Sequence, residues 1–135
     1  MDIIVCLDDK NGMGFNMRRQ SRDRVLIQHM LQFIEGKPLW VAPGSAALFD
    51  PLPGNVHVGE NYLLQAGAGE YCFVEDRKWE EFAHKVKRII VYRWNRRYPA
   101  DIRFPEAELK RRMLVSSTDF SGSSHDRLTQ EVYSI

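Results

Sequence analysis

Short apolar runs separated by polar turns divide the chain into predicted strands. The run Asp2–Leu7 is almost continuously apolar and rich in β-branched side chains, a pattern typical of a strand that is buried on both faces. Similar runs predict further strands at residues 39–42, 55–58, 71–74 and 88–94. Two later runs, residues 113–118 and 129–135, predict a closing hairpin.

Between the first two strands, apolar residues recur with helical spacing. They are Leu26, Ile27, Met30, Leu31 and Ile34. Ser21 is the expected N-cap, Asp23 falls in the first turn on the inward face, and Glu35-Gly36 ends the helix. Shorter helices are expected from Pro43-Gly44-Ser45 to Phe49, at residues 60–66, and around Trp79, Phe82 and Val86.

Strands that alternate with single helices predict an α/β fold with a mostly parallel central sheet, helices on both faces and a C-terminal antiparallel hairpin. The chain of 135 residues contains no repeat or low-complexity linker, so we expect one domain over residues 1–135. Cys6 and Cys72 each lie in an apolar strand. We expect both thiols to be buried and unpaired.

Composition narrows the range of partners. Nineteen basic residues against eighteen acidic ones leave the chain almost neutral, which indicates no nucleic-acid or membrane partner. The N-terminus has no basic segment ahead of its apolar run and no signal-peptide pattern, and unpaired cysteines favour a cytoplasmic location. The cysteines and four histidines show no metal-ligand spacing, so no metal site is expected.

Several motifs, taken in order, resemble the dihydrofolate reductase family over nearly the whole chain. They are Asn11-Gly12-Met13-Gly14 after the first strand, Lys37-Pro38 before an apolar strand, the turn Leu52-Pro53-Gly54, the ungapped segment 88–105 ending in Phe-Pro, and the tail 124–132. The resemblance implies the three-layer fold of that family, with an NADPH site and a folate site at the sheet edge. It also implies that the strand of Cys6 lies beside the strand of Cys72 in the centre of the sheet.

The family's cofactor positions correspond here to Gly14, Gly44, Ser45, Glu75 and Asp76. The resemblance implies that glycines should stand at the last two positions, where they let backbone N–H groups approach the NADPH phosphates. Glu75 and Asp76 are instead expected to satisfy those N–H groups with their own carboxylates and to repel a phosphate. We therefore expect no bound cofactor, and in particular no useful affinity for NADPH.

The folate positions also differ from the family pattern. The family's proline-tryptophan pair is missing from residues 18–21, and its carboxylate-binding arginine is replaced by Asn55. Asp23 is a candidate for the catalytic acid of the family, although an ungapped count places Leu26 there and the helix dipole alone can explain a carboxylate. Arg93 ends a strand at the carboxyl edge, where α/β folds bind ligands, and is a second candidate for substrate binding.

Three functional hypotheses follow. The first is a pseudoenzyme of this fold that has lost folate reduction and binds a small anionic ligand or a protein partner. The alternative is a divergent NADPH-dependent reductase, which leaves enzymatic activity undecided. A weaker alternative is a nucleic-acid accessory protein that uses arginine patches such as Arg93-Trp94-Asn95-Arg96-Arg97-Tyr98. His125, in a Gly-Ser-Ser-His-Asp turn, is expected to be an ordinary hairpin residue.

Overall fold

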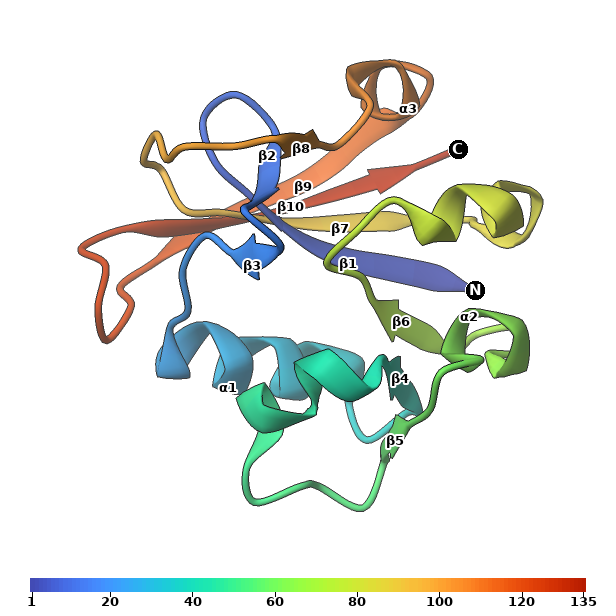
Figure 1. Ribbon diagram of the computed structural model, residues 1–135. Coiled ribbons are helices and arrows are strands. Elements are labelled where there is room, and N and C mark those ends of the chain that lie inside the picture. The colour runs from blue at the N-terminus through green and yellow to red at the C-terminus, as the bar shows by residue number, and fades with distance from the viewer.

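A seven-stranded sheet forms the centre of the protein in the computed structural model, which describes residues 1–135 (Figure 1). The strand order is β5-β4-β6-β1-β7-β10-β9. The strands are β1 (Asp2–Leu7), β4 (Leu39–Val41), β5 (Val56–Val58), β6 (Tyr71–Phe73), β7 (Ile89–Arg93), β9 (Met113–Phe120) and β10 (Leu128–Ser134). The first five in spatial order pair in parallel, and β10 and β9 pair antiparallel. The predicted α/β class, the mostly parallel sheet and the C-terminal hairpin are confirmed.

The strand of Cys6 does lie beside the strand of Cys72 in the centre of the sheet. β1 pairs with β6 on one side, placing Ile3 opposite Cys72, and with β7 on the other. Ile3, Ile4 and Leu7 are fully buried, as expected for a strand covered on both faces. Both cysteines are unpaired, but only Cys72 is fully buried, because Cys6 borders a pocket at the sheet edge.

Successive side chains of the central strands point to opposite faces of the sheet and pack into two separate hydrophobic cores. Ile3, Val5 and Val91 belong to one core, whereas Ile4 and Ile90 belong to the other. The helix α1 (Arg24–Ile34) covers the second core and lies below the central strands in Figure 1. The sheet is therefore one layer between two covering layers.

The start of α1 differs from the sequence prediction. Asp23, and not Ser21, is the N-cap: its extended backbone precedes the helix, and its carboxylate accepts hydrogen bonds from the N–H groups of Val25 and Leu26. The inward face was predicted correctly, because Leu26, Met30 and Ile34 are buried together with Asp23. Glu35 ends the helix in a left-handed conformation.

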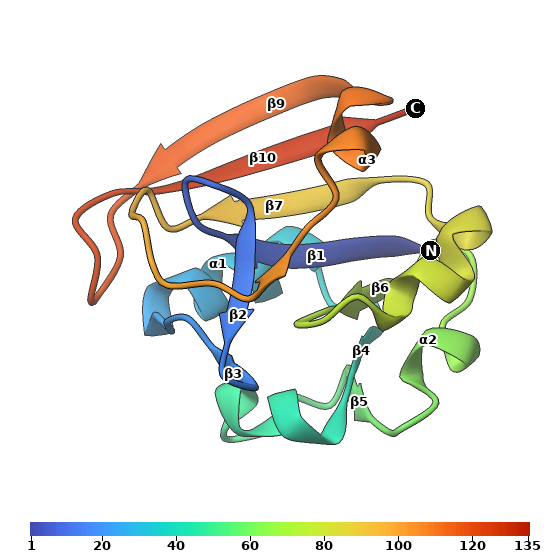
Figure 2. The same ribbon diagram turned by 45° about the horizontal axis from the view of Figure 1, so that its top comes forward.

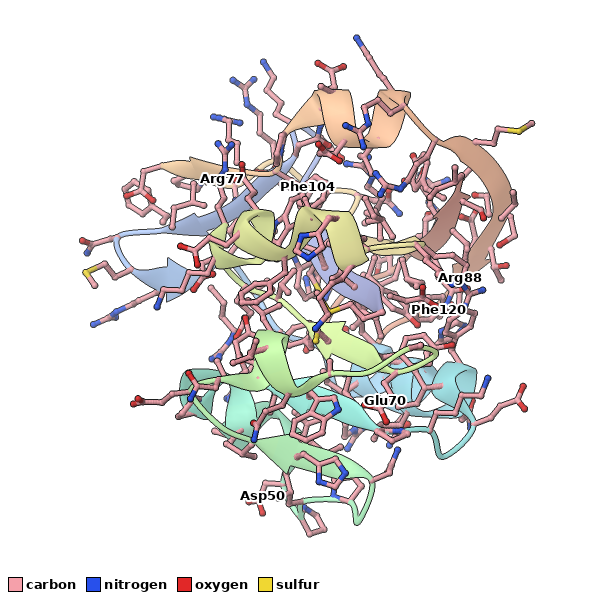
Figure 3. The ribbon with its side chains drawn as sticks, turned by 90° about the vertical axis from the view of Figure 1, so that its right-hand side faces the viewer. Asp50, Glu70, Arg77, Arg88, Phe104 and Phe120 are labelled. Carbon is pink, nitrogen blue, oxygen red and sulfur yellow. The ribbon has the colours of Figure 1, made fainter.

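The short helices form where they were expected but are mostly of the tighter 3-10 type. Pro43 opens the 3-10 helix η1 (Pro43–Phe49), and α2 is reduced to Tyr62–Gln65. The third, η2 (Lys78–Lys85), is interrupted at Phe82 by non-helical torsion angles. Trp79 and Val86 are buried beneath it, and the Trp79 ring stacks on Phe104, which Figure 3 labels close to this segment.

The hydrophobic pattern predicted neither a second, smaller sheet nor a last helix. β2 (Gly12–Phe15), β3 (Arg18–Arg19) and β8 (Ile102–Arg103) form this sheet, and β2 crosses β1 at a steep angle in Figure 2. The helix α3 (Glu106–Lys110) lies beside the β9–β10 hairpin in the same view. These elements have few apolar residues, so no clear period marks them in the sequence.

The two thiols are expected to be unreactive in the folded protein. Burial, with a smaller contribution from the Glu75 carboxylate, raises the pKa of the Cys6 thiol, and burial raises the pKa of Cys72 to about 12. Neither cysteine should therefore react with Ellman's reagent in native protein at about pH 8, and both should react after denaturation. A rapidly reacting thiol in the native protein would contradict this assignment.

Candidate functional site

An open groove of about 1300 Å³ brings together all five candidates for cofactor binding. Gly14 contributes from β2, Gly44 and Ser45 from the start of η1, and Glu75 and Asp76 from the loop after β6. The groove follows the carboxyl ends of parallel strands, where this class of fold places ligands. Residues distant in the sequence thus meet at one site.

A cluster of polar side chains holds Glu75 in this groove. Arg19 binds its carboxylate through two nitrogens, with Nε 2.9 Å from Oε2 and Nη2 3.0 Å from Oε1. Ser45 Oγ donates to Oε1 over 2.6 Å, and Arg19 Nη2 also donates to the backbone oxygen of Gly44. Hydrogen bonding to Glu75 raises the pKa of Arg19. A bidentate pair of this kind fixes both side chains in direction as well as distance.

The sequence prediction for the two acidic residues is therefore half correct. Asp76 does satisfy a helix N–H group, because its Oδ1 accepts from the backbone of Lys78 over 2.9 Å. Glu75 does not: its carboxylate turns toward Arg19 and Ser45 instead of the helix start. Arg77 forms an ion pair with Glu80 at the protein surface, where Figure 3 labels it, so it does not serve the groove.

Sequence reasoning missed Arg19. The sequence assigns it no role of its own, because nothing along the chain indicates that β3 crosses to the end of β6. A bidentate partner for Glu75 could be inferred only once both strands are placed. Three other basic side chains, Arg18, Arg22 and Lys78, line the groove without an acidic partner.

Next to the groove lies a nearly closed pocket of only about 20 Å³. Cys6, Leu26, Phe73 and Trp94 are among its walls, and Arg19 and Glu75 stand between it and the groove. A volume of this size holds a single water molecule, whereas pockets for drug-sized ligands occupy roughly 300–1000 Å³. Large side chains therefore fill the space behind the groove.

Asp23 borders this pocket, as predicted, but its carboxylate is committed to a buried network. The side chain is 0% exposed. Besides the N–H groups of its own helix, Oδ1 accepts from the backbone of Ser123 and Oδ2 from that of Ser124, and His125 Nδ1 lies 2.9 Å from Oδ2. Burial acts to raise the pKa of Asp23, but these hydrogen bonds outweigh it and hold the pKa well below its usual range.

The prediction for His125 was wrong. The residue is buried, its ring packs against Trp94 with centroids 4.7 Å apart, and Nε2 lies 3.1 Å from Ser21 Oγ and 3.2 Å from the hydroxyl of Tyr98. It appeared to be a turn residue because its neighbours are glycine and serine. Two of its actual partners, Ser21 and Asp23, lie about 100 residues earlier, which the local pattern cannot reveal.

The two substrate-binding candidates lie outside the groove. The Asn55 side chain is half-buried and donates to the backbone oxygen of Lys37 over 2.9 Å. Arg93 points to the opposite face of β7 from Trp94, where Nε lies 2.9 Å from Glu131 Oε1 and Nη1 donates to Asn11 Oδ1 over 2.6 Å. The structure therefore does not bring Asn55 or Arg93 together with Asp23, Glu75 or Ser45.

The structure offers little support for a nucleic-acid site, a metal site or a membrane-spanning helix. Trp94, the tryptophan of the arginine-rich segment, is buried, so its ring is not open to a nucleic-acid base. No group of three or more histidine, cysteine, aspartate or glutamate side chains is arranged to hold a metal ion. None of the helices combines the length and the apolar character needed to cross a membrane.

Comparison with known proteins adds no assignment. No protein-family model matches the chain, and no curated protein matches it. The fold and the site together define the class of protein: an α/β protein with an open, charged groove at the carboxyl edge of its sheet and a nearly filled pocket behind it.

Proposed function

We propose that this protein is a binding module with a dihydrofolate-reductase-type fold that has lost folate reduction and takes a small anionic ligand in its open groove. The observation that carries the proposal is the position of Glu75. A carboxylate bound by Arg19 and Ser45 stands where the family resemblance implies that a cofactor phosphate should lie.

The part of the proposal that concerns the fold rests on the order and direction of the strands in the sheet. The parallel strands β5, β4, β6, β1 and β7, followed by the antiparallel β10 and β9, agree with the mostly parallel sheet and C-terminal antiparallel hairpin that the resemblance implies. The loss of folate reduction rests on the filled pocket. A pteridine ring does not fit into about 20 Å³ between Leu26, Phe73 and Trp94 without displacing large side chains.

The ligand class follows from the charges in the groove. Arg18, Arg22 and Lys78 are exposed and have no acidic partner, so they attract an anion without first breaking an ion pair. Asp76 has no basic partner and stands where the family resemblance implies the NADPH pyrophosphate, whereas Glu75 is already paired with Arg19. One carboxylate at close approach repels a phosphate by up to about 4 kcal/mol at an effective dielectric constant near 20.

Calorimetric titration with two compounds tests the proposal. Inorganic pyrophosphate should bind with an affinity that falls as salt rises and falls further in the Arg22→Ala variant. NADPH should show no saturable binding in the micromolar range. Arg111→Ala is the matched control, because Arg111 is an exposed arginine outside the groove and should leave pyrophosphate binding unchanged.

The alternative, a divergent NADPH-dependent reductase, has one observation in its favour: the groove is open and large enough for an extended ligand. A dissociation constant for NADPH at or below the micromolar range would favour it over our proposal. Absence of pyrophosphate binding would reject the anion-binding module itself.

A further inference from the structure

The side chains of Ser21, His125 and Asp23 form a chain of hydrogen-bonding contacts at the border of the groove. Ser21 Oγ lies 3.1 Å from His125 Nε2, and His125 Nδ1 lies 2.9 Å from Asp23 Oδ2. Ser21 lines both the closed pocket and the open groove, so its hydroxyl is within reach of a bound molecule. From this geometry we propose that Ser21 is a nucleophile, with His125 as its general base and Asp23 as the group that orients the base.

The protonation states fit these roles. Hydrogen bonds hold the pKa of Asp23 far below its usual range, so its carboxylate is ionised and can only accept. Nδ1 of His125 must therefore carry the proton, which leaves the lone pair of Nε2 facing Ser21. A nucleophile, a base within hydrogen-bond reach and a third group that orients the base are the arrangement that activates a serine.

The base is also held rigidly. His125 and Asp23 side chains are 3% and 0% exposed, and the imidazole lies against the Trp94 ring. The Tyr98 hydroxyl approaches Nε2 as well, at 3.2 Å, so it shares this nitrogen with Ser21. The backbone N–H groups of Ser21 and Arg22 donate to no group within the protein, so they are free to stabilise an oxyanion beside the nucleophile.

The reaction class is hydrolysis of a carboxylic ester. Ser21 Oγ attacks the carbonyl carbon while its proton passes to His125 Nε2. The bond from carbon to the leaving oxygen then breaks, and the departing alcohol takes that proton. A water molecule cleaves the Ser21 ester by the same route, which releases the acid and restores the serine. Arg22, which borders Ser21 and has no acidic partner, favours an ester that carries a negative charge.

Labelling with a fluorophosphonate tests the nucleophile directly and needs no groove ligand. Ser21 Oγ attacks phosphorus, fluoride leaves, and peptide mass spectrometry locates the adduct. We expect one adduct, on Ser21, absent from Ser21→Ala and unchanged in Ser116→Ala, an exposed serine on β9. His125→Gln should slow labelling at least about a hundredfold, since a general base contributes roughly 10²–10⁴.

If His125→Gln does not fold, labelling of the wild-type protein alone still tests whether Ser21 is an activated nucleophile. Labelling must disappear in denaturant, because an unfolded chain has no triad. Absence of labelling in the native protein, an adduct on another serine, or equal labelling of native and unfolded chains would each overturn the proposal. The charge preference is read from 4-nitrophenyl hemisuccinate against 4-nitrophenyl acetate: faster cleavage of the charged ester supports the assigned substrate class, and equal rates reject it.

Discussion

Replacing Asp23 with alanine is expected to lower the free energy of unfolding by about 2–5 kcal/mol. The substitution removes the acceptor shared by the N–H groups of Val25, Leu26, Ser123 and Ser124, and it takes away the partner of the buried His125 ring. Loss of a helix N-cap alone costs about 1 kcal/mol, and the unpaired donors of the 123–124 segment add to it. Chemical denaturation followed by circular dichroism measures the difference.

Asp23→Asn is the matched control, because the amide keeps the shape and one acceptor oxygen but loses the charge. It should destabilise less than alanine, and it should flatten the acid limb of the stability curve. The folded-state pKa of Asp23 is depressed, so its contribution is present above about pH 4, the usual range of aspartate, and is lost as pH falls through the lower folded-state value. A loss below about 1 kcal/mol for Asp23→Ala would show that the network contributes little to folding.

The fold was largely predictable because its core follows simple periods. Asp2–Leu7 and the β7 region are almost continuously apolar, which is typical of a strand covered on both faces, and α1 repeats its buried residues every four positions. The small sheet of β2, β3 and β8 escaped prediction because these strands have mixed exposure and no period of two. Backbone hydrogen bonds between β2 and its neighbours β3 and β8 hold these strands in place. The local pattern of apolar and polar residues gives no sign of such pairing.

The sequence predicted which residues line the groove, because their positions follow from the order of the strands. It did not predict which side chains contact one another. Gly44, Ser45, Glu75 and Asp76 meet in one groove because each follows a strand at the same edge of the central sheet, and Gly14 joins them from β2 of the small sheet. The partners of these residues could not be predicted. Arg19 reaches Glu75 across 56 positions, and His125 reaches Asp23 across 102. Such contacts become visible only when the loops are placed on the sheet.

The same segment, residues 18–23, serves both halves of the site. Arg19 neutralises Glu75 in the groove, and two residues later Ser21 turns to His125 at the pocket border. The resemblance implies a proline-tryptophan pair in this segment, whose aromatic ring would belong to a pterin site. Charged and hydroxyl side chains occupy it here, and their polar contacts join β3, α1 and the loop at 123–125.

Trp79→Ala is expected to cost about 3–5 kcal/mol of folding free energy, because it opens a cavity in the core beneath η2. Trp79 is 1% exposed and stacks on Phe104 with ring centroids 5.0 Å apart.

The indole Nε1 of Trp79 is buried without a hydrogen-bond partner, so Trp79→Phe removes an unsatisfied donor while keeping most of the aromatic contact. We expect the phenylalanine variant to lose no more than about 1–2 kcal/mol. Urea denaturation of the two variants beside wild type measures both values. Equal losses for phenylalanine and alanine would mean that the indole N–H contributes to stability, contrary to the unpaired position assigned to it.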